Sequence, residues 1–239
     1  MGATTTDRKS AALSTASGGS TTLPPMTKKR ERPTDLREAC IREALAIIDA
    51  EGVEELSLRE VARRLGVSHQ APYKHFPSRD HILAEIVARA FASFARYLNE
   101  QPHSENPHAD LLAMSSAYLR YAKEHPLQYR LMFGTPLPDT EVHPHMMAQA
   151  RHAFSLLCEA LRRRSVPGKG TGDSAASDAA VLLDALFIWS ALHGLSGISS
   201  GCTLQELGMP LGVIDKAAPH MLERIGSALG DPGTPPKRA

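Results

Sequence analysis

The stretch Glu54–Asp80 reads EELSLREVARRLGVSHQAPYKHFPSRD, and its local signals predict how the chain folds. Ser57 is followed three residues later by Glu60, which is the pattern of a capping box, so a short helix should begin there. Gly66 ends this helix after Leu65, because glycine adopts the conformation of a helix C-terminus without strain. We therefore expect one short helix followed at once by a tight turn.

A second short helix is predicted from His69 to about Phe76. Ser68 is placed to cap it, and Pro72 falls in its first turn, where backbone amides lack partners within the helix anyway. Two helices joined in this way are typical of a helix-turn-helix, whose second helix can enter the major groove of DNA. A helix pair that serves only packing is the alternative that the residues leave open.

The predicted second helix carries side chains suited to DNA recognition. Gln70 can pair bidentately with adenine, and the methyl group of Ala71 can contact the methyl group of thymine. Arg59, in the preceding helix, points to the same surface and can reach a guanine or a phosphate. The candidate base contacts are Arg59, His69, Gln70 and Ala71. The candidate phosphate contacts have hydroxyl, ammonium, imidazole or guanidinium donors, and they are Ser68, Tyr73, Lys74, His75 and Arg79.

The whole chain has 239 residues, a net charge of +1 and three cysteines. That length allows one large or two modest domains with a real buried core. The cysteines are scattered without CxxC spacing, which favours free thiols in a reducing cytoplasm over disulfides or a zinc site. Because no long apolar run or signal-peptide core occurs, we expect a soluble cytoplasmic protein without a membrane partner.

Composition divides the chain into four segments. The first is rich in Ser, Thr, Gly and Ala, so it should not offset the entropy of ordering. Its basic end, Lys28–Arg32, can follow DNA phosphates or can be a solvated linker. A helix over about 34–51 should complete a three-helix head with the helix pair. The predicted segments are a disordered basic tail (1–33), a DNA-binding domain (34–80), a helical ligand-binding and dimerisation domain (81–230) and a second disordered tail (231–239).

Hydrophobic periodicity predicts helices throughout the larger domain, so the fold class should be all-α. A long helix from Ser78 to about Glu100 should link it to the head. The helix from about Ser177 to Ile198 is apolar on nearly every side and needs burial all round, and the last helix, Val213 to about Leu229, should join it. Too little chain remains to cover both, so a second subunit should complete a four-helix interface. A monomer that wraps both helices internally is the alternative.

Two runs resemble the DNA-binding head of the TetR family of bacterial transcriptional regulators: Ser57–Ser68 (SLREVARRLGVS) and Ala71–Phe76 (APYKHF). The resemblance implies a homodimer whose recognition helices enter successive major grooves of a near-palindromic operator. It further implies a repressor that a small ligand releases, located in the bacterial cytoplasm and on the nucleoid when bound. A TetR-like activator, or a helical interaction module without DNA binding, is the alternative. On the matching positions Gln70 and Ala71 would face bases, and phosphates would be held by Tyr73, His75 and Arg79.

Two later segments resemble a C-terminal domain of this family that is named for its Trp-His-Gly residues. They are Tyr121–Gly134 (YAKEHPLQYRLMFG) and Trp189–Gly194 (WSALHG). Trp189 and His193 are four residues apart, hence on one helical face that can line a ligand cavity. Core packing is the alternative for each of these side chains, and the ligand is expected to be small and apolar. The candidate ligand contacts are Tyr118, Phe133, Phe154, Trp189 and His193.

Catalysis is not expected from this sequence. It contains none of the GxSxG, P-loop or HExxH patterns that mark common hydrolytic and nucleotide-binding sites. His143 and His145 with Glu141 have metal-ligating side chains, but they lie in a loop interrupted by proline, without the spacing of a metal site. We therefore predict no enzyme activity, no cofactor and no bound metal.

Overall fold

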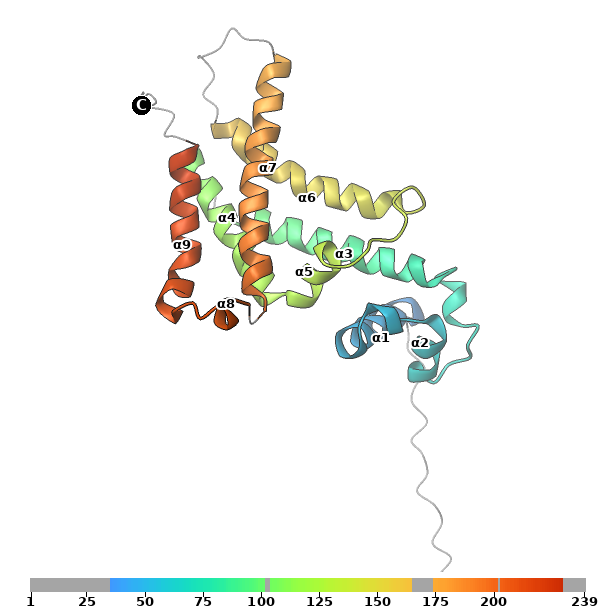
Figure 1. Ribbon diagram of the computed structural model, residues 1–239. Helices are drawn as coiled ribbons and strands as arrows, with labels where there is room; N and C mark the ends of the chain where they lie inside the picture. The colour runs from blue at the N-terminus through green and yellow to red at the C-terminus, as the bar shows by residue number, and fades with distance from the viewer. Residues whose placement is uncertain (1–34, 102–103, 165–173, 202, 230–239) are drawn as a thin grey trace, which may run out of the picture. The chain divides into compact units, whose positions relative to one another are not determined.

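The computed structural model describes residues 35–101, 104–164, 174–201 and 203–229 (Figure 1). All regular elements within these ranges are helices, which confirms the all-α prediction. Both predicted tails lie outside the described residues. In chain order the helices are α1 (Leu36–Glu51), η1 (Val53–Glu55), α2 (Leu58–Leu65), η2 (Pro72–Lys74), α3 (Arg79–Asn99), α4 (Pro107–Glu124), α5 (Pro126–Phe133), α6 (Pro144–Arg164), α7 (Ser174–Ser199), α8 (Thr203–Glu206) and α9 (Leu211–Ala228).

Capping residues set the ends of the first helices. The Asp35 carboxylate accepts a hydrogen bond of 3.1 Å from the Glu38 amide and so caps α1. The Ser57 hydroxyl oxygen accepts a bond of 3.2 Å from the Glu60 amide at the start of α2. Gly66 ends α2 in the left-handed conformation, with φ of 67°. The predicted start and end of this helix are therefore confirmed.

The predicted α-helix over 69–76 is wrong, because this segment is a turn followed by the single 3-10 turn η2. Pro72 has no amide hydrogen and cannot donate to the Ser68 carbonyl, four residues earlier. That carbonyl instead accepts from the Ala71 amide at 2.9 Å, which tightens the chain into a turn. The Phe76 amide does reach the Pro72 carbonyl at 2.9 Å, so one helix-type bond remains. The recognition segment is thus shorter and tighter than its sequence predicts.

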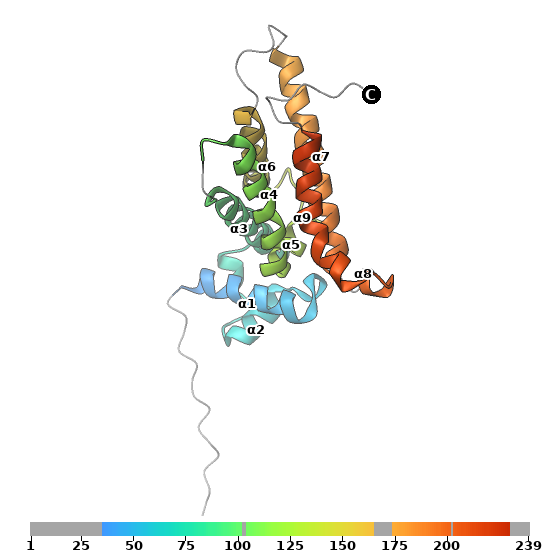
Figure 2. The same ribbon diagram turned by 90° about the vertical axis from the view of Figure 1, so that its left-hand side faces the viewer.

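Helix α3 runs from the head into the body, where it lies along α6 (Figure 1). Helices α4 and α5 also pack on α3, and α7 packs on α6 and α4. Helix α9 lies beside α4 and α7 in both views (Figures 1 and 2). Phe94 of α3 sits at the centre, with ring centroids 5.3 Å from Tyr118, 5.0 Å from Tyr121 and 6.2 Å from Phe133. An aromatic core therefore joins α3, α4 and α5.

Ion pairs tie α1 of the head to α3. The Arg89 guanidinium donates two hydrogen bonds, of 2.6 and 2.7 Å, to the Glu38 carboxylate of α1 and one of 2.7 Å to Glu85. Arg37 of α1 in turn lies 3.0 Å from Glu85. The hydrogen bonds from Arg89 lower the pKa of Glu38, so this carboxylate stays ionised at neutral pH. A shift of α3 along its axis would have to break these pairs or carry α1 with it.

Candidate nucleic-acid interface and internal pocket

The predicted DNA contacts lie mainly on the surface of the head. Among the nine, only Ala71 and Arg79 are half-buried. The exposed ones are Arg59, Ser68, His69, Gln70, Tyr73, Lys74 and His75. The recognition segment therefore presents hydroxyl, amide, imidazole and ammonium groups to the solvent, which is the set of donors that DNA bases and phosphates require.

Two buried residues hold the recognition segment in place. Pro72 is buried, and Phe76, four residues later, is only 3% exposed. The guanidinium carbon of Arg37 lies 5.3 Å above the centroid of the Phe76 ring, so α1 covers this anchor. Because both anchors face inward, the three residues between them, Tyr73, Lys74 and His75, face outward. A segment with little regular hydrogen bonding thus keeps its polar face exposed.

The Arg79 guanidinium is already hydrogen-bonded to backbone carbonyls of the head, unlike a side chain that is free to contact phosphate. Its guanidinium donates to the carbonyl of Leu56 at 3.1 Å and to that of Val53 at 2.6 Å. A third nitrogen pairs with Asp80 at 3.2 Å. Arg79 therefore fastens the first turn of α3 to the segment between α1 and α2. Contact with a phosphate stays a prediction for this residue.

Replacement of Arg79 by alanine is expected to lower the free energy of unfolding by about 1–2 kcal/mol, because two backbone carbonyls lose a charged donor. Urea unfolding followed by circular dichroism measures this change. Lys74→Ala is the matched control, since Lys74 is exposed and its loss should leave stability unchanged. Equal stability of the Arg79→Ala and Lys74→Ala proteins would show that the hydrogen bonds from Arg79 contribute nothing to the free energy of unfolding.

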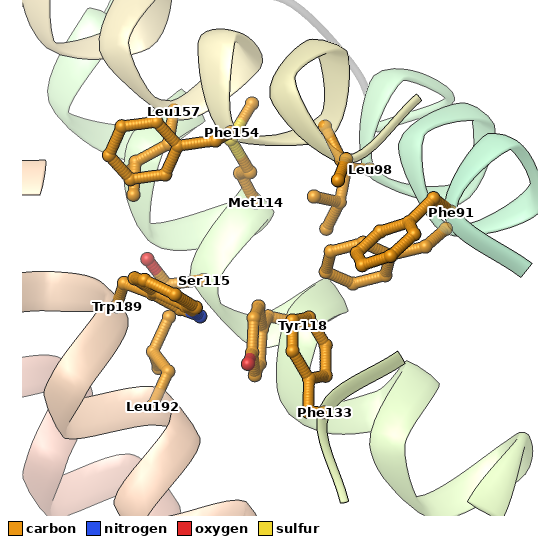
Figure 3. A pocket seen from close by; sticks show the side chains of 13 residues that line it. Phe91, Leu98, Met114, Ser115, Tyr118, Phe133, Phe154, Leu157, Trp189 and Leu192 are labelled. Carbon is orange, nitrogen blue, oxygen red and sulfur yellow. The ribbon is translucent and has the colours of Figure 1, made fainter. Parts of the chain in front are cut away.

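The body contains an internal pocket between α3, α4, α5, α6 and α7 (Figure 3). Its cavity volume is about 60 Å³, and the wider unfilled space of about 520 Å³ around it includes open solvent. Four of the five predicted ligand contacts line it: Tyr118, Phe133, Phe154 and Trp189. Nine further residues line the pocket but were not predicted as ligand contacts: Phe91, Phe94, Leu98, Met114, Ser115, Ala150, Ala153, Leu157 and Leu192.

His193, the fifth predicted ligand contact, does not line the pocket but completes a hydrogen-bonded cluster behind its wall. The Tyr129 hydroxyl lies 2.7 Å from Nδ1 of His193, and the Tyr118 hydroxyl lies 3.1 Å from that of Tyr129. Burial raises the pKa of both phenols, so they stay protonated and act as hydrogen-bond donors. Tyr129 therefore donates to His193 if the ring nitrogen is unprotonated. The cluster satisfies polar groups that would otherwise be buried without partners.

The described residues offer no metal centre. Among them, no group of three or more His, Cys, Asp or Glu side chains lies close enough to hold a metal ion. His143 and His81 do meet, with ring centroids 4.8 Å apart, but they form an edge contact of two rings. The candidate sites are therefore the polar outer face of the head and the apolar cavity of the body.

Two family models match this chain. The model described as bacterial regulatory proteins, tetR family, matches residues 41–86, which include the helix-turn-helix. The model described as the tetracyclin repressor-like C-terminal domain matches residues 111–225, which include α5 to α7 and most of α4 and α9. The second match does not specify the Trp-His-Gly type, so that narrower resemblance stays a prediction.

Known proteins are similar over most of the chain. An uncharacterised HTH-type transcriptional regulator of Mycobacterium tuberculosis is 27% identical over 180 residues, which are 75% of this chain and 77% of that protein. A protein of unknown function from Rhodococcus sp. RHA1 has a similar solved structure, with a TM-score of 0.65 and 23% identity over 84% of this chain and 98% of that one. FadR from Bacillus subtilis, solved in complex with stearoyl-CoA, has a TM-score of 0.58 and 14% identity over 80% and 97% of the two chains. At these identities the two structures show a shared fold.

Proposed function

Because this chain belongs to the TetR family of bacterial transcriptional regulators, we propose that it is a repressor which binds a near-palindromic operator as a homodimer and which a small apolar ligand releases. It is a helix-turn-helix transcriptional regulator. The observation that carries the proposal is the pairing of an exposed polar recognition segment with an internal aromatic pocket, both of which border α3. The activator remains the second candidate.

The exposed polar face of the head supports the operator contacts. Gln70 and Ala71 lie ahead of the buried Pro72, so they would meet base edges first, with Arg59 of α2 beside them. Tyr73 and His75 would then donate to phosphates. In a dimer, two such segments about 34–36 Å apart would fit successive major grooves.

The last long helices support the dimer. Helix α7 buries Val181, Ala185 and Ile188 against the body, yet it leaves Leu183 and Phe187 exposed. The segment Asp178–Ser199 is long and apolar enough to cross a membrane by length and composition. A second copy of α7 and α9 would cover this face instead, as in a four-helix interface. The exposed large apolar side chains of these last elements are Leu182, Leu183, Leu186, Phe187, Ile198, Leu207, Met209, Leu211 and Val213.

Helix α3 supports the coupling between ligand and DNA. Its inner face lines the pocket with Phe91, Phe94 and Leu98, and its outer face holds α1 through Arg89. A ligand that prefers one position of α3 would therefore change the position of the head. Full reversal between two states requires the ligand to discriminate between them by about 5.5 kcal/mol.

Fluorescence anisotropy with DNA from upstream of the gene tests the proposal. The proposed repressor should bind this DNA as a dimer, and reporter output should rise when the gene is deleted. A fall in reporter output would favour the activator, and failure to bind any duplex DNA would favour an interaction module. The salt dependence of affinity separates phosphate contacts from base contacts.

The Gln70→Ala variant is expected to lose about 1–3 kcal/mol of operator binding and to relax the preference at one base position, because a base-edge contact disappears. Binding selection from a random DNA pool measures the preference. Tyr73→Phe is the matched comparison, since removal of a phosphate donor should weaken binding to operator and random DNA alike. Equal losses on both kinds of DNA for Gln70→Ala would contradict its role in base reading.

A further inference from the structure

The pocket is walled by aromatic rings and carries no charge. None of the described residues that line it is a lysine, arginine, histidine, aspartate or glutamate. Six of them are aromatic, and they come from all five helices around the cavity: Phe91, Phe94, Tyr118, Phe133, Phe154 and Trp189. Figure 3 shows the Phe154 and Trp189 rings on one side of the space and the Phe91 and Phe133 rings on the other.

The few polar groups at the wall already have protein partners. The Ser115 hydroxyl donates to the Leu111 carbonyl at 2.8 Å. The Tyr118 hydroxyl lies 3.1 Å from that of Tyr129, beside the hydrogen bond that Tyr129 makes to His193. An anionic group placed in the pocket would find no cation to offset its desolvation, which costs several kcal/mol for each ion. A neutral ligand has no such cost.

We propose that the effector is an uncharged aromatic compound, and that this pocket rejects aromatic carboxylates. This inference rests on the proposed function, because it names the ligand class of the same pocket.

Two ligands of nearly the same shape test whether the pocket rejects a negative charge. Acetophenone and benzoate share the benzene ring and differ in a methyl group against a charged oxygen. Calorimetry on the full chain is expected to show one ketone per chain, bound at least ~100-fold more tightly than the carboxylate. Trp189 is the only tryptophan of the chain, so a change in its emission reports whether the bound ketone lies in this pocket.

A substitution at Met114 tests whether charge alone decides the ligand class. Met114 separates the pocket from an outer groove lined by Glu159 and Arg162. Met114→Arg places a guanidinium in the wall that the pocket shares with this groove. We expect this variant to bind benzoate at least ~10-fold more tightly than the native chain, because the carboxylate gains a cation. Met114→Leu, which adds no charge, should keep the preference for the ketone.

The outcomes separate the ligand class from the regulatory function. Native protein that binds benzoate as tightly as the ketone, or that shows no saturable binding of the ketone, overturns the inference. Operator binding without ligand, measured by anisotropy on the same preparation, decides the proposed DNA-binding function by itself. If Met114→Arg does not fold, as circular dichroism would show, the comparison of the two ligands on the native chain still decides.

Discussion

A chain in which Leu183 and Phe187 are both replaced by arginine is expected to be a monomer that no longer binds operator at concentrations that saturate the native protein. These side chains are 68% and 47% exposed in the single chain and lie four residues apart, on one face of α7. Burial of such a side chain contributes about 1.5–3 kcal/mol, and a symmetric dimer buries each of them twice. The expected loss is therefore on the order of 6 kcal/mol or more, before repulsion between the new charges is added.

Loss of the dimer should also remove DNA binding, because each head alone contacts only half of the operator. Light scattering after size-exclusion chromatography measures the mass, and anisotropy measures operator affinity. Ala148→Arg is the control, since it places an arginine at an exposed position of α6 away from the proposed interface. A double-arginine protein that stays dimeric would contradict the proposed interface. One that is monomeric but binds operator normally would contradict the link between dimer and operator.

Sequence patterns predicted the helices well where the signals are local. Ser57 and Gly66 bound α2 as expected, because a cap and a left-handed glycine act within one turn of the helix. The long α3 was predicted from the spacing of its apolar residues, and its observed range is Arg79–Asn99. Such features depend on neighbours in sequence, so a single sequence is enough to place them.

The head shows where local signals are insufficient. Pro72 permits a helical first turn, and the pattern alone did not predict that the segment would tighten into a 3-10 turn. Arg79 was predicted to hold phosphate, but its partners Val53 and Leu56 lie more than twenty residues earlier in the sequence. The length of a short helix and the choice of a hydrogen-bond partner both depend on tertiary contacts, which no periodicity records.

Only part of the pocket lining was predicted from the sequence, because the rest depends on tertiary contacts. Trp189 and Phe133 were candidates because they belong to recognisable segments, and both line the cavity. Phe91 and Phe94 follow the helical spacing of a core face, and that pattern is the same whether the space opposite is filled or empty. An unfilled space depends on side-chain volumes from five helices together, so the sequence of any one helix cannot reveal it.

Phe76→Ala is expected to weaken operator binding at least ~100-fold while the dimer and the pocket persist. Phe76 is 3% exposed and is one of two buried anchors of the recognition segment, beneath the Arg37 guanidinium of α1. Truncation of a buried phenylalanine to alanine costs about 3–5 kcal/mol, because contacts are lost and a cavity remains. The segment has few regular backbone hydrogen bonds to resist this loss, so it should no longer hold Tyr73 and its neighbours in one arrangement.

Hydrogen exchange, operator affinity and ligand binding together test this expectation. Exchange should become faster over residues 68–79 and stay unchanged in α6 and α7, while operator affinity falls at least ~100-fold, as the loss of ~3 kcal/mol implies. Tyr73→Ala is the control, because Tyr73 is exposed and its removal should weaken DNA binding without loosening the segment. If Phe76→Ala binds operator normally, the segment is held by contacts other than this ring. If its exchange rises equally throughout α3 to α7, the head and body do not respond separately to the loss of a head anchor.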